Sequence, residues 1–201
     1  MDVHTEPTAA RQAATGILRP CRSIVVVGLM GAGKTKIGRR LATRLSLPFF
    51  DSDEVIETAA GETIEEIFAN RGEAAFRDGE RRVIARLLTG PIHVLATGGG
   101  AFMDPATRRV IAARGVSVWL RADLDVLFAR VSRRTNRPLL KTPDPRAVLG
   151  ELIERRHPIY AEADVTIDSG EGPPDATASR AIAALSRCKR THRPPEAEGA
   201  E

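Results

Sequence analysis

Short apolar runs alternate along this chain with stretches in which apolar residues recur every third or fourth position. The first apolar run, Ser23–Val27, is followed by Ile37, Leu41 and Leu45 at helical spacing. A continuous apolar run is typical of a strand buried on both faces, and the helical spacing predicts an amphipathic helix. Because this alternation repeats, it predicts an α/β domain in which helices flank both faces of a parallel sheet.

Strand and helix positions follow from the same pattern together with capping residues. The expected strands are Ser23–Val27, Leu47–Phe50, Ile92–Ala96, Val116–Leu120 and Val165–Ile167. The expected helices are Lys34–Ser46, Asp53–Ala60, Thr63–Asn70, Glu73–Thr89 and Asp175–Arg187, with three more opening at Asp104–Pro105, Asp123 and Asp144–Pro145, the last ending near Arg156. Thr63 and Glu66 have the spacing of a capping box.

Both ends of the chain lack sustained periodicity. We expect residues 1–22 to form a disordered leader and residues 190–201 a disordered acidic tail. The remaining residues, 23–189, are predicted to form a single domain.

The composition of the 201 residues narrows the possible classes of protein. Hydrophobic residues make up 42%, enough for one sizeable core, and Cys21 and Cys188 alone provide no disulfide framework. No apolar run approaches the roughly 20 residues needed to span a bilayer. The net charge of +4 is small and aromatic residues are only 4%, which argues against nucleic-acid binding. We therefore expect a cytoplasmic protein without nucleic-acid or membrane partners.

The strongest local motif lies between the first strand and the first helix. Gly28–Thr35 reads GLMGAGKT and fits the phosphate-binding pattern GxxxxGK[ST]. Backbone N–H groups of such a loop cradle phosphates, Lys34 would reach the β- and γ-phosphates, and the Thr35 hydroxyl would bind Mg²⁺. The predicted ATP-binding set is Gly31, Ala32, Gly33, Lys34, Thr35 and Lys36. No NKxD signature for guanine occurs, so ATP and a small-molecule kinase are favoured over a GTPase.

Two further groups follow the second and third strands. Asp51 and Asp53 are two residues apart, so in extended geometry they project to the same side, one near Mg²⁺ and one on an acceptor hydroxyl. The alternative is that both only cap the following helix. Thr97 is followed by Gly98, Gly99 and Gly100, which allow backbone to touch a ligand closely or simply form a flexible turn.

Six segments in this order resemble those of shikimate kinases, across about Ser23–Ile167. They read GLMGAGKT, FFDSDEVIE, GEAAFR, TGGGA, RPLL and RHPIYAEAD. The resemblance implies Mg²⁺- and ATP-dependent phosphorylation of the shikimate 3-hydroxyl, in aromatic amino-acid biosynthesis. It also implies a monomer with the fold of nucleoside monophosphate kinases, a five-stranded sheet in the order 2-3-1-4-5 and a lid at about residues 132–142.

The resemblance also implies roles for individual residues. Asp53 would orient the acceptor hydroxyl and Asp51 would lie near the metal, whereas Arg77 and Arg156, which alone read as solvated helix residues, would grip the shikimate carboxylate. Gly98, Gly99 and Gly100 would line that pocket. Arg137 would be the lid arginine that closes on the transferring phosphoryl group, and Arg130 would lie beside adenine. Lys34, Asp53 and Arg137 form the predicted catalytic set.

Two departures from the family pattern are visible. Lys36 stands where a hydroxyl residue is frequent, and Ile159 replaces the commoner leucine. Neither position has a catalytic role in the prediction. Two other functions stay open from the residues alone: another small-metabolite or nucleotide kinase of the same fold, such as a gluconate or adenylate kinase, and a non-catalytic ATP-binding regulator.

Overall fold

The computed structural model describes residues 18–133, 142–170 and 172–195. Its elements in chain order are β1 (Ser23–Val27), α1 (Lys34–Leu45), β2 (Phe49–Asp51), α2 (Ser52–Ala60), α3 (Ile64–Leu88), β3 (Val94–Ala96), η2 (Ala101–Met103), α4 (Pro105–Arg114), β4 (Gly115–Arg121), α5 (Leu124–Ser132), α6 (Pro145–Tyr160), β5 (Val165–Asp168), α7 (Pro174–Arg187) and η4 (Lys189–His192).

The strands form one parallel sheet in the order β2-β3-β1-β4-β5, which confirms the predicted fold class and strand order. The central strand β1 pairs on both sides, with Ile24 opposite Val94 in β3 and opposite Val116 in β4. All five residues of β1 are buried. A continuous apolar sequence is therefore required here, because both faces of a parallel sheet are covered.

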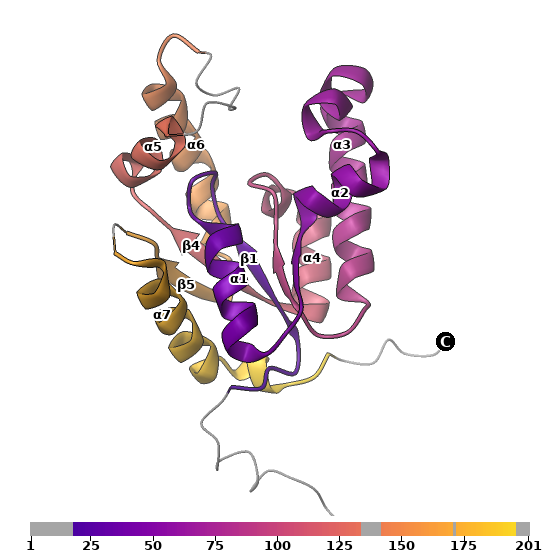
Figure 1. Cartoon of the computed structure of the whole chain (residues 1–201), viewed down its shortest axis with the longest axis vertical. Coiled ribbons are helices and arrows are strands. Elements are labelled where there is room, and N and C mark those ends of the chain that lie inside the picture. The colour runs from indigo at the N-terminus through magenta and orange to yellow at the C-terminus, as the bar shows by residue number, and fades with distance from the viewer. Residues whose placement is uncertain (1–17, 134–141, 171, 196–201) are drawn as a thin grey trace, which may run out of the picture.

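Helices cover both faces of the sheet (Figure 1). Helices α1 and α7 pack against each other on one face, and α3 packs against α4 on the other. At the carboxyl ends of the strands, the α2–α3 pair and the α5–α6 pair rise on opposite sides of the loop that joins β1 to α1 (Figure 1). In open α/β sheets this edge is where ligands bind.

Two hydrophobic clusters pack the helices and the sheet together. The larger one surrounds the sheet and contains the whole apolar run of β1. A smaller one consists of Ile56, Ile67 and Phe76 and joins α2 to α3. Because the second cluster lies apart from the main core, the α2–α3 projection has its own packing.

Several elements differ from the predicted ones, and β3 for instance begins at Val94 and not at Ile92. The two helices expected at 63–89 are continuous in α3, with a kink at Gly72, where φ is 78° and ψ is 169°. The predicted capping box of Thr63 and Glu66 is present at its start. Strand β2 starts two residues later and ends one residue later than expected, at Phe49–Asp51. Helix α6 continues past Arg156 to Tyr160, although Pro158 lies inside it.

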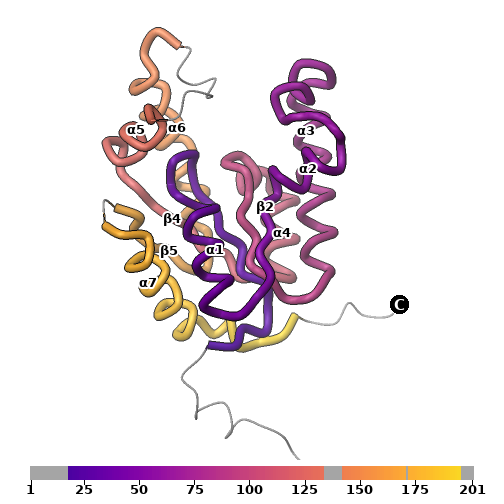
Figure 2. Tube along the Cα trace, in the orientation of Figure 1, coloured from indigo at the N-terminus to yellow at the C-terminus, as the bar shows by residue number. Residues whose placement is uncertain are grey.

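The folded part of the chain extends beyond residues 23–189. Arg22 is buried, and its guanidinium donates to the carbonyls of Ala113, Arg193 and Pro194. The backbone N–H of Cys21 donates to the Thr191 carbonyl at 2.8 Å. The segments just before β1 and just after α7 therefore lie side by side at the amino end of the sheet (Figure 2).

Most of the predicted lid, residues 134–141 with Arg137, lies outside the described residues. Within the described ranges, no helix combines the length and the apolar character needed to cross a membrane.

Candidate active site

The loop between β1 and α1, Gly28–Thr35, is called the P-loop below. Gly28 has φ 138°, and a Cβ atom there would lie 2.8 Å from the Leu120 carbonyl oxygen in β4. Only glycine combines this backbone conformation with such close approach of a neighbouring strand. The loop thus packs tightly onto the sheet edge, and its last glycine, Gly33, is the N-cap of α1.

Lys34 and Thr35 are the first residues of α1, so both lie where the positive end of the helix dipole meets the loop. The Lys34 ammonium donates to the carbonyls of Gly28 and Leu29, at 2.8 and 3.0 Å. The Thr35 hydroxyl donates to the Asp51 carboxylate at 2.7 Å. The structure therefore brings together the two residues predicted to lie near the metal.

Asp51 and Asp53 do not share the extended geometry that the sequence predicts. Asp51 ends β2, and its carboxylate caps α2 by accepting from the Asp53 N–H at 3.1 Å. Asp53 consequently lies in the first turn of α2. The expectation of two extended residues was wrong, because the cap starts the helix at once. Both side chains nevertheless line one cavity.

That cavity has a volume of about 600 Å³ and lies along the P-loop. Its lining includes Lys34, Thr35, Lys36, Asp51, Asp53, Thr97, Gly99, Arg130, Ser169 and Thr177. The size falls in the range of about 300–1,000 Å³ typical of small-molecule sites. Cations, carboxylates and backbone N–H groups border one space, which suits a phosphate-bearing ligand.

Arg130 links the P-loop to the segment after β5. Its guanidinium donates to the Gly31 carbonyl at 3.3 Å and to the Ser169 hydroxyl at 3.2 Å, and it also contacts the Gly170 carbonyl. Ser169 is buried and donates to the Ala32 carbonyl at 2.9 Å. Arg130 therefore joins the P-loop to the segment after β5 on the wall of the cavity.

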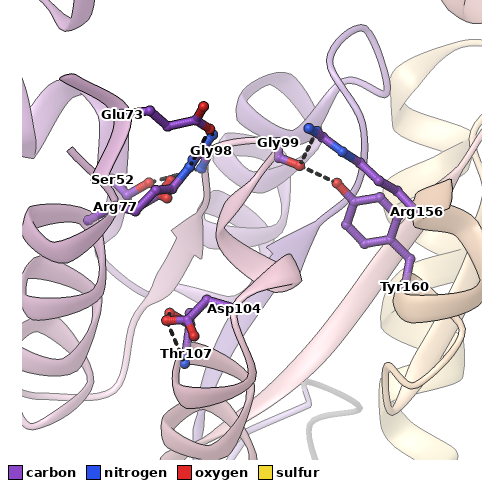
Figure 3. A network of polar contacts seen from close by, with 10 residues as sticks. Ser52, Glu73, Arg77, Gly98, Gly99, Asp104, Thr107, Arg156 and Tyr160 are labelled. Carbon is purple, nitrogen blue, oxygen red and sulfur yellow. Dashed lines mark hydrogen bonds and ion pairs between the residues drawn. The ribbon is translucent and has the colours of Figure 1, made fainter. Parts of the chain in front are cut away.

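Arg77 reaches Gly98–Gly100, called the glycine segment below, from α3 (Figure 3). Its guanidinium forms ion pairs with Glu80 at 2.7 Å and with Glu73 at 3.2 Å. A Cβ atom on Gly100 would lie 2.6 Å from this guanidinium, so only glycine leaves room for it. Arg77 is thus held against the backbone of the segment.

Glu80 is the most buried carboxylate of this region, with 2% of the residue exposed. Burial raises the pKa of Glu80, and the Arg77 guanidinium acts in the opposite direction. The carboxylates of Glu80 and Asp53 both approach the Cα of Gly98, since a Cβ atom there would meet an oxygen of each. The predicted substrate residues Asp53, Arg77 and Gly98 are therefore neighbours.

Arg156 approaches the glycine segment from the opposite side, on α6 (Figure 3). Its guanidinium donates to the Gly99 carbonyl at 3.1 Å. The same oxygen accepts from the Tyr160 hydroxyl at 2.5 Å. Arg77 and Arg156 are 79 residues apart in the sequence numbering and yet flank one three-residue segment beside the P-loop.

Sequence reasoning missed three residues of this region. Glu80 lies three positions after Arg77 and Tyr160 four positions after Arg156, so helical spacing was the signal that could have found both. Ser169, which bonds both Arg130 and the P-loop, has no local signal in the sequence. The described residues contain no group of three or more His, Cys, Asp and Glu side chains able to hold a metal alone.

Comparisons with known proteins point to one family. A shikimate kinase family model matches residues 30–186, which include the glycine segment and both arginines. A shikimate kinase of Paramagnetospirillum magneticum is 60% identical over 164 residues, which cover 82% of this chain and 84% of the relative. The solved structure of a shikimate kinase from Acinetobacter baumannii in complex with shikimate has a TM-score of 0.80 and 37% identity, covering 89% of this chain and 98% of that one. A gluconokinase from Sinorhizobium meliloti, at 21% identity, a TM-score of 0.56 and coverage of 84% and 94%, shares the fold.

Proposed function

This chain belongs to the shikimate kinase family and phosphorylates shikimate with ATP, and we propose that the reaction takes place where the P-loop meets the glycine segment. The observation that carries this placement is the convergence of Asp53, Arg77 and Arg156 around Gly98–Gly100, next to the cavity along the P-loop. ATP bound along the P-loop and shikimate bound at the glycine segment would therefore lie next to each other.

The P-loop binds the ATP phosphates. Its N–H groups and the amino end of α1 supply partial positive charge, and Lys34 supplies a full charge once it exchanges its bonds to the Gly28 and Leu29 carbonyls for phosphate oxygens. Gly31, Ala32, Gly33, Thr35 and Lys36 complete the predicted nucleotide set. Arg130, which bonds Ser169 on the cavity wall, takes the place beside adenine that the family resemblance gives it.

Thr35 and Asp51 fit a Mg²⁺ ion that accompanies ATP. Mg²⁺ is bound by one or two protein oxygens together with substrate phosphates and waters, and these two side chains place a hydroxyl and a carboxylate 2.7 Å apart on the cavity wall. The ion would neutralise charge on the β- and γ-phosphates. Before the ion binds, the Thr35 hydroxyl donates a hydrogen bond to the Asp51 carboxylate, so the two metal ligands already lie side by side.

The two arginines bind the shikimate carboxylate. A guanidinium presents a planar fork of donors that matches a carboxylate, so two of them approaching from α3 and α6 fix both the position and the orientation of the ring. Glu73 and Glu80 hold Arg77. Gly99 holds Arg156 through its carbonyl. The ring would rest on the glycine segment, where the absence of Cβ atoms leaves space for it.

Asp53 orients the acceptor. Its carboxylate lies at the start of α2, on the wall of the cavity that the P-loop and Gly99 also line. A hydroxyl bonded to this carboxylate is polarised as an acceptor and faces the γ-phosphate. The family resemblance gives the 3-hydroxyl of shikimate this place. Phosphoryl transfer depends mainly on such alignment and on charge neutralisation, and little on covalent chemistry by the protein.

Several parts of the proposal rest on the sequence and its family resemblance. Arg137 lies outside the described residues, and we assign it to the transferring phosphoryl group as the lid residue of the family. We also propose that the chain acts as a cytoplasmic monomer, without nucleic-acid or membrane partners.

The test is steady-state kinetics with shikimate and ATP varied separately. ADP release should require shikimate, and Arg156→Lys should raise the KM for shikimate about tenfold or more while the KM for ATP changes less than twofold. Turnover supported by gluconate or a nucleoside monophosphate instead of shikimate would favour another kinase of this fold. ATP binding without turnover on any acceptor would favour a regulator.

A further inference from the structure

Tyr160 makes a contact that the reaction described above does not use. The side chain is fully buried, and its hydroxyl donates to the Gly99 carbonyl, the same oxygen that accepts from Arg156. Figure 3 shows the two donors meeting at this one oxygen from the same helix. A carbonyl oxygen has two lone pairs, so both donors can be satisfied together.

The ring of Tyr160 packs against two other aromatic rings. It stacks on Phe102 with a centroid distance of 6.1 Å and on Trp119 with a distance of 5.9 Å. Burial raises the pKa of Tyr160 well above its ordinary value, while the Arg156 guanidinium nearby acts in the opposite direction. The hydroxyl therefore stays protonated and acts as a permanent hydrogen-bond donor at neutral pH.

Tyr160 and Arg156 occupy the same face of α6. They are four residues apart, and side chains at this spacing are neighbours on a helix. Tyr160 lies inside the helix because α6 runs through Pro158 to its last turn. Two side chains of one helical face thus determine the position of one peptide group.

That peptide group also touches the P-loop. A Cβ atom on Gly99 would lie 3.4 Å from the Met30 backbone nitrogen and 3.7 Å from the Gly28 carbonyl oxygen. Gly99 is therefore packed between the nucleotide loop and the arginine assigned to the shikimate carboxylate. Whatever fixes its carbonyl fixes the position of that arginine relative to the phosphates.

We propose that the Tyr160 hydroxyl is a positioning group for shikimate, which acts by holding the Gly99 carbonyl to which Arg156 is bound. The inference rests on the proposed function, in which Arg156 binds the carboxylate. Without the hydroxyl, the Gly99 carbonyl keeps Arg156 as its donor but loses its second anchor. The guanidinium is then less well oriented for its substrate, whereas the phosphate-binding groups keep their own contacts.

Tyr160→Phe tests this proposal, because it removes one oxygen and keeps the stacked ring. Loss of one buried neutral hydrogen bond corresponds to about a fivefold change in an equilibrium constant, so we expect the KM for shikimate to rise about fivefold. The kcat and the KM for ATP should change less than twofold. An unchanged shikimate KM, or equal rises in both KM values, would overturn the proposal.

A double-mutant cycle separates an effect through Arg156 from a general structural effect. In the Arg156→Lys background, Tyr160→Phe should change the shikimate KM less than twofold, because the positioned guanidinium is already gone. If the two factors multiply instead, the hydroxyl acts independently of Arg156 and the proposal is wrong. If Arg156→Lys alone leaves the shikimate KM unchanged, the assignment of Arg156 fails, and this outcome is distinct from a failure of Tyr160→Phe alone.

Ser117→Ala is the matched control. The buried Ser117 hydroxyl donates to the Asp164 carboxylate at 2.8 Å, near the amino end of β4 and away from the site. This variant also loses a buried hydroxyl hydrogen bond, and it should lower the unfolding midpoint while leaving both KM values unchanged. A shikimate KM raised equally in Ser117→Ala would assign the Tyr160 effect to general destabilisation and overturn the proposal.

Discussion

Replacing Gly100 by alanine tests the position of the Arg77 guanidinium. The new Cβ atom would lie 2.6 Å from that guanidinium, whereas ordinary van der Waals contact begins at about 3.4 Å. The backbone accepts alanine, because Gly100 has φ −102° and ψ −16°. The clash is therefore confined to the end of a flexible side chain, which must move by about 0.8 Å.

The expected effect is on shikimate binding and not on folding. A displacement of roughly 1 Å in a substrate-positioning group can cost up to about 100-fold, and Arg77 shares the carboxylate with Arg156, so we expect a rise of about tenfold in the shikimate KM. The free energy of unfolding should change by no more than about 1 kcal/mol, because the clash is with the movable end of the Arg77 side chain. The measurement is ADP release at varied shikimate and saturating ATP, with urea unfolding of the same preparations.

Gly79→Ala is the control for this variant. Gly79 lies in α3 between Arg77 and Glu80, and apart from its chain neighbours and the backbone of its own helix no heavy atom lies within 4 Å of a Cβ placed there. Alanine in a helix interior should stabilise the protein by about 0.5–1 kcal/mol and leave both KM values unchanged. If Gly100→Ala leaves the shikimate KM at the wild-type value, or raises the ATP KM equally, the position assigned to Arg77 is refuted.

Three further predictions concern other parts of the molecule. Lys34→Ala should lower kcat by about 10²–10³-fold in the ADP-release assay, because it removes the cation next to the transferring phosphoryl group; a loss below tenfold would contradict this role. Arg22→Ala should lower the free energy of unfolding by about 2–3 kcal/mol in urea titrations without changing either KM, because its three carbonyl contacts lie at the amino end of the sheet. Burial lowers the pKa of His93 below 6.5. As the pH falls, the unfolded chain therefore takes up a proton on this histidine before the folded chain does, and the stability should fall below about pH 6.5. His93→Gln should reduce that slope in unfolding experiments, and an unchanged slope would show that His93 does not cause it.

The fold was predictable because its signals are local. The apolar run of β1, the capping box of α3 and the Asp104 cap of α4 depend on neighbouring residues, and each is present where the sequence places it. The phosphate loop was equally clear, since its glycines, lysine and threonine are adjacent in the chain. These local patterns predict the observed elements because tertiary packing favours the same structure as the local sequence.

The predicted helix boundary that was wrong depends on tertiary contacts. The sequence predicts that helix α6 ends near Arg156, and an X–Pro pair such as His157–Pro158 usually does end a helix. In the structure, the stacking of Tyr160 on Phe102 and on Trp119 and its bond to Gly99 stabilise one more turn. No pattern within the helix reveals these partners, because they come from η2, β4 and the glycine segment.

The structure at the two ends of the domain also depends on tertiary contacts. Residues 18–22 have no periodicity, yet Leu18 and Arg22 are buried against parts of the chain that are distant in sequence. The Arg77–Glu80 pair, by contrast, follows from helical spacing once α3 is known. Candidate site residues could therefore be identified from motifs, whereas the groups that hold them needed the three-dimensional structure.

The central claim is that one site holds the phosphates of ATP and, beside them, the carboxylate of shikimate between two arginines. A crystal structure of this chain with shikimate and a non-hydrolysable ATP analogue tests it most directly. We predict the carboxylate within hydrogen-bond distance of Arg77 and Arg156, and a ring hydroxyl on Asp53 facing the γ-phosphate. Shikimate bound away from the glycine segment, or with its carboxylate turned away from both guanidinium groups, would contradict the account.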